Sequence, residues 1–76
     1  MGRHFTTRPA TEAGRKLAEA IEQHGLAEIA HQLGIDRYRL LHIVSGGREA
    51  RVSEVFAVAR SGIATLIDWV TPVSQS

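Results

Sequence analysis

The segment 26–44 contains two short apolar stripes of helical spacing, separated by only Gly34, Ile35 and Asp36. Glycine enters the left-handed conformation that ends a helix without strain, and aspartate is a favoured residue at the start of one. The segment therefore predicts helices at 26–33 and 37–44 that cross steeply in a helix-turn-helix, with Ile35 in the corner. The apolar residues on either side of the turn are Leu26, Ile29, Ala30, Leu33, Leu40, Ile43 and Val44.

A longer amphipathic segment precedes this pair and predicts a helix over 12–24. Thr11 is the expected N-cap residue, and Gly25 is expected to end the helix. The residues at inward spacing are Ala13, Leu17, Ala20, Ile21 and His24.

Two more short helices are predicted after the glycine-rich stretch at 45–47. The first covers 54–60, with Ser53 as its cap and with Val55, Phe56 and Ala59 facing inward. The second covers 63–70, and Pro72 prevents it from continuing. A short extended piece at 69–73 is the competing possibility for the last part, and the final residues are expected to fray.

Length and composition restrict the class of protein. A chain of 76 residues that is 43% hydrophobic forms one domain with a small core. It contains no cysteine, which excludes disulfides and thiolate metal sites within it. Its apolar runs are far shorter than the roughly 20 residues that cross a bilayer, so no membrane association and a cytoplasmic location are expected.

The net charge is only +1, but the charged residues are unevenly distributed. Residues 1–16 contain four bases and one acid, and residues 37–60 contain five bases and two acids. Between them, residues 17–36 contain four acids and no base. This distribution predicts a molecule whose basic parts meet an anion while its acidic part faces away. The alternative is that the charges only solvate exposed helix faces.

The sequence IAHQLGIDRYRLLHIVSGG, with one amphipathic segment before it and two after it, resembles the Cro and phage-repressor-like (XRE-type) helix-turn-helix family over roughly residues 11–70. The resemblance implies an all-α, compact five-helix, lambda-repressor-like domain with its helix-turn-helix at about 26–45. It implies a small bacterial or phage repressor that binds a double-stranded DNA operator as a homodimer. Residues 1–10 would form a flexible basic arm and residues 71–76 a C-terminal tail.

In such a complex the helix at 37–44 would enter the major groove. Arg37 can donate two hydrogen bonds to guanine, Tyr38 can contact a thymine methyl or a phosphate, and His42 can donate to a purine. Leu41 could pack on a thymine methyl or belong to the core. The predicted base contacts are Arg37, Tyr38, Leu41 and His42.

Residues that flank this face are predicted to contact phosphates, which fix the register without reading sequence. They are Arg39, Ser45, Arg48 and Arg51. The amides of the Ser-Gly-Gly stretch suit phosphate oxygens, although an ordinary turn has the same composition. Arg3 and Arg8 are predicted to enter the minor groove, with simple disorder of the arm as the alternative.

Dimerisation is predicted because one recognition helix spans only a few base pairs. The C-terminal part offers more apolar side chains than one short helix can bury inward, with core packing as the alternative for Trp69. The predicted dimerisation residues are Ile63, Leu66, Ile67, Trp69 and Val70.

Other function classes are less well supported by the sequence. It contains no nucleophile elbow and no phosphate-cradling loop, so neither an enzyme nor a cofactor is predicted. No metal site is predicted either, because His4, His24, His31 and His42 lack a common ligand spacing. The alternative to a DNA-binding regulator is an antitoxin-like or adaptor-like module that binds a protein partner through the same helical scaffold.

Overall fold

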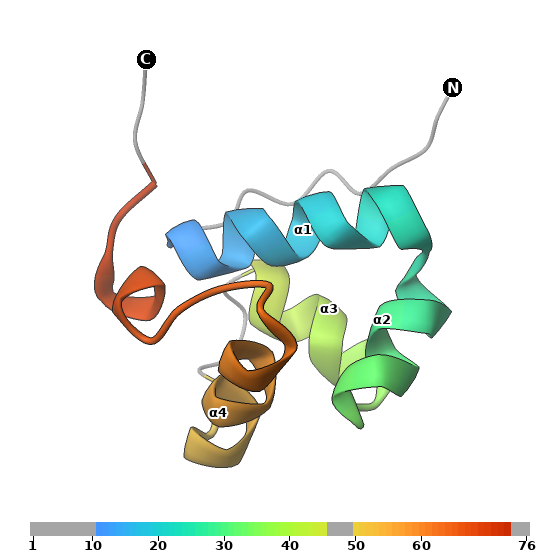
Figure 1. Cartoon of the computed structure of the whole chain (residues 1–76). Helices are drawn as coiled ribbons and strands as arrows, with labels where there is room; N and C mark the ends of the chain where they lie inside the picture. The colour runs from blue at the N-terminus through green and yellow to red at the C-terminus, as the bar shows by residue number, and fades with distance from the viewer. Residues whose placement is uncertain (1–10, 46–49, 74–76) are drawn as a thin grey trace.

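The computed structural model describes residues 11–45 and 50–73 of the chain. These residues form four α-helices and a 3₁₀ turn: α1 Glu12–His24, α2 Leu26–Leu33, α3 Arg37–Ser45, α4 Val52–Ser61 and η1 Ile67–Val70. No strand occurs in these two ranges, so the predicted all-α class is confirmed for them. Figure 1 shows α1 above α2, α3 and α4, with the C-terminal segment returning beside the start of α1.

The signals that predicted α1 operate as expected. The hydroxyl of Thr11 accepts a hydrogen bond from the Gly14 amide at 3.2 Å, which satisfies one of the free donors of the first turn. Gly25 follows the helix with a φ of 94°, a conformation that favours glycine. His24 is exposed, although its spacing placed it on the inner stripe. The buried residues of α1 are Ala13, Gly14, Leu17 and Ile21.

The junction between α2 and α3 is short and tightly bonded. Gly34 adopts the left-handed conformation, with φ 70° and ψ 30°. Its amide donates to the His31 carbonyl at 3.2 Å, and the Ile35 amide donates to the Ala30 carbonyl at 3.0 Å. These two bonds form a Schellman motif, which usually places an apolar residue just after the glycine. Ile35 is that residue and is 8% exposed, as the sequence predicted for the corner.

One hydrophobic core joins all four α-helices. Helix α1 packs against α2, α3 and η1, while α2 also packs against α3 and α4. Ile63 and Trp69 pack against this core from the C-terminal segment. The large side chains that are fully buried are Leu17, Ile29, Leu40, Val44 and Val58.

Helix α4 differs from its prediction in its start and in its buried face. It begins at Val52, two residues before the predicted start, and the carboxylate of Glu54 accepts the amide of Arg51 at 2.7 Å. That bond caps the first turn, so Ser53 is not the cap. The fully buried residue is Val58, whereas Phe56 is 47% exposed because it lies beside the inward stripe rather than on it.

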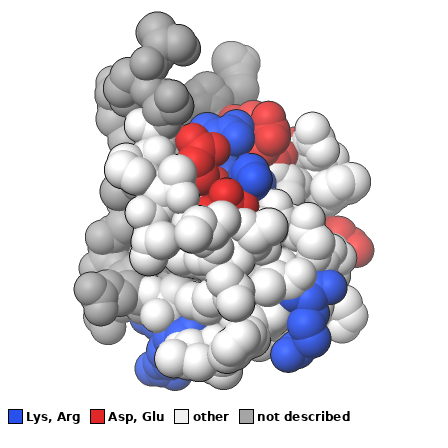
Figure 2. Space-filling model, turned by 60° about the vertical axis from the view of Figure 1, so that its left-hand side comes forward, with Lys and Arg blue, Asp and Glu red and all other residues white. Residues whose placement is uncertain are grey.

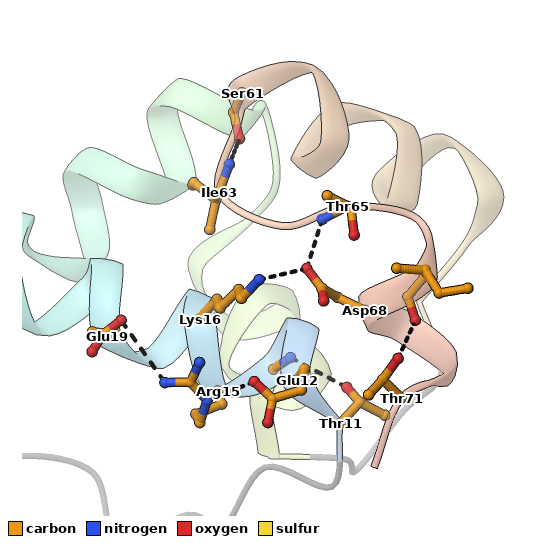
Figure 3. Close-up of polar contacts among 12 residues, drawn as sticks. Thr11, Glu12, Arg15, Lys16, Glu19, Ser61, Ile63, Thr65, Asp68 and Thr71 are labelled. Carbon is orange, nitrogen blue, oxygen red and sulfur yellow. Dashed lines mark hydrogen bonds and ion pairs between the residues drawn. The ribbon is translucent and has the colours of Figure 1, made fainter. Parts of the chain in front are cut away.

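The predicted fifth helix at 63–70 is wrong in extent. Gly62 ends α4 with a φ of 84°, and the chain stays irregular until the single 3₁₀ turn η1. Asp68 stabilises this turn, because it lies inside the turn instead of pointing to solvent and is only 8% exposed. Its carboxylate accepts the Thr65 amide at 2.8 Å and the Lys16 ammonium at 2.9 Å. Figure 3 shows Lys16 reaching from α1 to this carboxylate.

The start of the predicted C-terminal tail is bonded to α1. The Glu12 amide donates to the Thr71 carbonyl at 2.9 Å, and Thr11 and Pro72 form an isolated antiparallel β-bridge. Thr71 is fixed further because its hydroxyl donates to the Ile67 carbonyl at 2.7 Å (Figure 3). The two ends of the described chain therefore support each other, so the segment through Pro72 belongs to the folded unit.

Candidate nucleic-acid interface

Helix α3 has one buried side and one polar exposed side. Leu40 and Val44 are at most 1% exposed, and Ile43 is 6% exposed. Arg37, Tyr38 and His42 are exposed, with Tyr38 at 74%, while Leu41 is half-buried. The structure therefore places three of the four predicted base contacts at the surface of one helix. Leu41 lies between the core and that surface.

The first turn of α3 is held by Asp36. One oxygen of its carboxylate accepts the amide of Tyr38 at 3.0 Å and that of Arg39 at 3.3 Å. A negative group at the N-terminal end of a helix also interacts favourably with the helix dipole. Arg37 lies in the same turn, so its backbone is held by the Asp36 cap. Its guanidinium makes no ion pair within the described residues.

Arg39 differs from its neighbour Arg37 because its guanidinium is engaged by α4. Its Nε and Nη2 atoms each lie 2.9 Å from a different carboxylate oxygen of Glu54. The hydrogen bonds from Arg39 lower the pKa of Glu54, and the same contact raises the pKa of Arg39. The sequence marked Arg39 as a phosphate contact but gave no signal for this partner, since no helical spacing relates residues that are 15 positions apart.

The other predicted phosphate contacts are only partly described. Ser45 is half-buried, and its hydroxyl donates to the His42 carbonyl at 3.2 Å. Arg51 is exposed at the start of α4 and has no ion pair in the part of the chain that the structure describes. The other arginines with predicted contacts, Arg48 for a phosphate and Arg3 and Arg8 for the minor groove, lie outside the described residues.

The distribution of paired and unpaired charges is asymmetric. The described cations without an ion pair are Arg37, Arg51 and Arg60, all on α3, on α4 or at its start. Arg60, an exposed residue in the last turn of α4, was not among the predicted contacts. On α1, by contrast, Arg15 bonds to Glu12 at 2.8 Å.

The side of the molecule on which α4 and η1 lie has few charges. Figure 2 shows acidic and basic side chains gathered in the upper part, an acidic group at the right edge, separate basic groups in the lower part and a broad uncharged surface between them. Three of the predicted dimerisation residues are exposed, namely Leu66 at 50%, Ile67 at 68% and Val70 at 76%. We call these three residues the η1 apolar cluster. Helix α4 adds Val52 and Phe56, which are 72% and 47% exposed.

The other two predicted dimerisation residues, Ile63 and Trp69, are half-buried and pack against the core. The indole Nε1 of Trp69 is buried without a hydrogen-bond acceptor within the described ranges. Indole N–H groups usually find a partner when buried, so this donor is an exception in an otherwise well-bonded segment. The main role of both side chains here is to close the C-terminal side of the core.

Within residues 11–45 and 50–73, no three or more histidine or acidic side chains are grouped so that they could hold a metal ion. None of the helices in these ranges is both long and apolar enough to cross a membrane. No protein-family model matches the sequence, and neither a curated protein nor a solved structure shows significant similarity to it. The geometry of α3 and its surroundings is therefore the basis for a functional proposal.

Proposed function

We propose that this protein is a sequence-specific regulator that binds double-stranded DNA by inserting α3 into the major groove. The observation that carries the proposal is the division of α3 into two sides. Leu40, Ile43 and Val44 anchor it to the core, while Arg37 and Tyr38 extend from its first turn into solvent. An α-helix fits the major groove, and arginine at such a position can bond both acceptors of guanine.

The charge distribution supports a polyanionic ligand on this side. The three unpaired described cations belong to α3 and α4, whereas Glu22 and Glu28 on α1 and α2 have no described cation partner. The phosphates of a nucleic-acid backbone would be attracted to these unpaired cations. Arg51 is exposed and has no ion pair among the described residues, which supports its proposed role as a phosphate contact.

The proposal includes a homodimer that acts as a small repressor of the Cro-like type. Two copies of α3 related by a two-fold axis would read half-sites about 34 Å apart. The η1 apolar cluster supports dimerisation because its three large side chains are exposed together within five residues of the chain.

A selection from a randomised double-stranded DNA library tests the base-reading role of Arg37. Arg37→Ala should weaken binding to the preferred sequence by about 1–3 kcal/mol and relax the preference at one base pair, because a bidentate contact is lost. Arg15→Ala is the matched control, since Arg15 is paired with Glu12 on α1. If the Arg37→Ala protein selected the same sequences with the same ratios, α3 would not read bases through Arg37.

Salt dependence tests the phosphate contact independently. Arg51→Ala should weaken binding to all sequences alike and should reduce the slope of log affinity against log salt concentration by about one. The same substitution at Arg15 should leave the slope unchanged. Equal slopes for the Arg51→Ala and unaltered proteins would remove Arg51 from the phosphate contacts.

A second candidate function is a module that binds a protein partner, as an antitoxin or an adaptor does. The observation that favours it is the exposure of Val52 and Phe56 on α4 together with the η1 apolar cluster. Affinity for an apolar partner would depend little on salt, whereas affinity for DNA falls steeply as salt rises. A protein that shows no salt-dependent binding to any DNA would favour this second function.

A further inference from the structure

A bidentate ion pair joins the first turn of α3 to the first turn of α4. Arg39 Nε lies 2.9 Å from Glu54 Oε2, and Arg39 Nη2 lies 2.9 Å from Glu54 Oε1. The two side chains are only 18% and 11% exposed. A planar guanidinium that contacts both carboxylate oxygens fixes an orientation as well as a distance, which a lysine ammonium cannot do.

Both ends of this pair are also part of a helix cap. Glu54 Oε1 accepts the Arg51 amide at 2.7 Å, which ties the carboxylate to the backbone that starts α4. On α3, the Arg39 amide and the Tyr38 amide both donate to the carboxylate of Asp36. The pair therefore connects two capped helix starts, and a shift of either one would be transmitted to the other.

We propose that the Arg39–Glu54 pair positions the first turn of α3 for DNA recognition, and that Arg39 acts through Glu54 rather than as a phosphate ligand. This inference rests on the proposed function, because Arg37 and Tyr38 directly precede Arg39 on the helix. Hydrogen bonds to base edges tolerate only a few tenths of an ångström in length. If the Arg39–Glu54 pair were broken, the first turn of α3 could shift. Its hydrogen bonds to bases would then be lost, while the longer-range attraction between its positive charges and phosphates would remain.

Two substitutions distinguish an effect on the position of the first turn of α3 from an effect of the positive charge of Arg39. Arg39→Lys keeps the positive charge but cannot form the bidentate pair. Glu54→Gln keeps an acceptor for the cap of α4, since glutamine also serves at that position, but removes the carboxylate that Arg39 requires. Lys16→Gln is the matched control, because it breaks an ion pair of the same 2.9 Å length that ties α1 to Asp68.

We expect Arg39→Lys and Glu54→Gln each to weaken binding to the preferred DNA sequence on the order of tenfold, with much smaller losses on unrelated sequences. The double variant should be no weaker than either single one, since both remove the same contact. The salt slope should stay unchanged in Arg39→Lys, because the positive charge still faces the Glu54 carboxylate. Lys16→Gln should lower thermal stability without changing sequence preference, which separates positioning from general stability.

The opposite pattern would overturn the proposal. If Arg39→Lys and Glu54→Gln bound like the unaltered protein, while Arg39→Gln weakened every sequence alike and lowered the salt slope by about one, Arg39 would be a phosphate ligand. Additive losses in the double variant would likewise show that the two residues act separately.

A measurement on the free protein keeps this inference distinct from the proposed function. The Leu40 amide donates to the Asp36 carbonyl at 2.8 Å, the first backbone hydrogen bond along α3. Glu54→Gln should speed hydrogen exchange of this amide severalfold, while the Ile21 amide in α1 should exchange at its original rate. Unchanged exchange at Leu40 would overturn the positioning role. Failure of the unaltered protein to bind any DNA would instead overturn the proposed function.

Discussion

The substitution Leu40→Ala tests how much the inner side of α3 contributes to the fold. Leu40 is 0% exposed and belongs to the core that joins the four α-helices. The substitution removes three carbon atoms, which at about 0.8 kcal/mol per methylene corresponds to about 2.4 kcal/mol of transfer free energy. The cavity left behind adds to this value, so the free energy of unfolding should fall by about 2–5 kcal/mol.

That loss is large for a domain of this size. A 76-residue domain has a total free energy of unfolding of about 4–11 kcal/mol, at roughly 0.05–0.15 kcal/mol per residue. A change of 1 kcal/mol shifts the melting temperature of such a domain by about 4–8 °C. Thermal melting followed by far-ultraviolet circular dichroism should therefore show a melting temperature lower by at least about 8 °C, and urea titration should show the loss of unfolding free energy directly.

Leu66→Ala is the matched control, because it makes the same chemical change at a residue that is 50% exposed. In the monomer it should cost less than about 1 kcal/mol. Both variants should be measured at two protein concentrations, since any dimer adds a concentration-dependent contribution at Leu66. Equal losses for the two variants at low concentration would refute the assignment of the buried side of α3.

Three further predictions follow from other parts of the structure. Gly34 has a φ of 70°, so Gly34→Val should lower the free energy of unfolding by at least about 1–2 kcal/mol in urea titration, and Gly34→Asn should lower it less. Hydrogen bonds from Lys16 and Arg39 lower the pKa values of Asp68 and Glu54 below their ordinary values of 3.8 and 4.5. The stability that these acids contribute is therefore present above the ordinary values and is lost as the pH falls through the lower values of the folded state. The urea concentration at the unfolding midpoint should fall between about pH 6 and about pH 2, and the fall should be shallower in Asp68→Asn. The same fall in both proteins would contradict the role of the Lys16 contact. Ile67→Glu should reduce self-association in sedimentation experiments, because it places a charge in the η1 apolar cluster, and a monomeric unaltered protein, free and on DNA, would remove the dimer proposal.

The helices that the sequence predicted well are those whose ends depend on nearby residues. Thr11 caps α1 from three residues away, and Gly34 ends α2 through bonds to its own last turn. Each signal needs only one residue type within a few positions of the chain. For α4, Ser53 and Glu54 both offered a cap, and the sequence alone did not show that the carboxylate of Glu54 would take the Arg51 amide.

The predicted fifth helix was wrong because its alternative depends on a distant residue. Apolar spacing over 63–70 satisfies a helical pattern, but Asp68 finds Lys16, which lies 52 positions earlier. A nearly buried carboxylate is costly unless it is paired and hydrogen-bonded, so the segment adopts the conformation that meets both Lys16 and the Thr65 amide. Local periodicity cannot predict such a choice.

The sequence predicted that Arg37 contacts a base and that Arg39 contacts a phosphate, but it did not predict that Arg39 pairs with Glu54. Two positions along an α-helix rotate a side chain by about 200°, so these arginines project from nearly opposite sides of α3. One meets Glu54, and the other meets solvent. Of the six bases within the described ranges, Arg15, Lys16 and Arg39 are neutralised by acids in this way. Among the described residues, the cations still available to an anionic ligand are therefore those of α3 and of the two ends of α4.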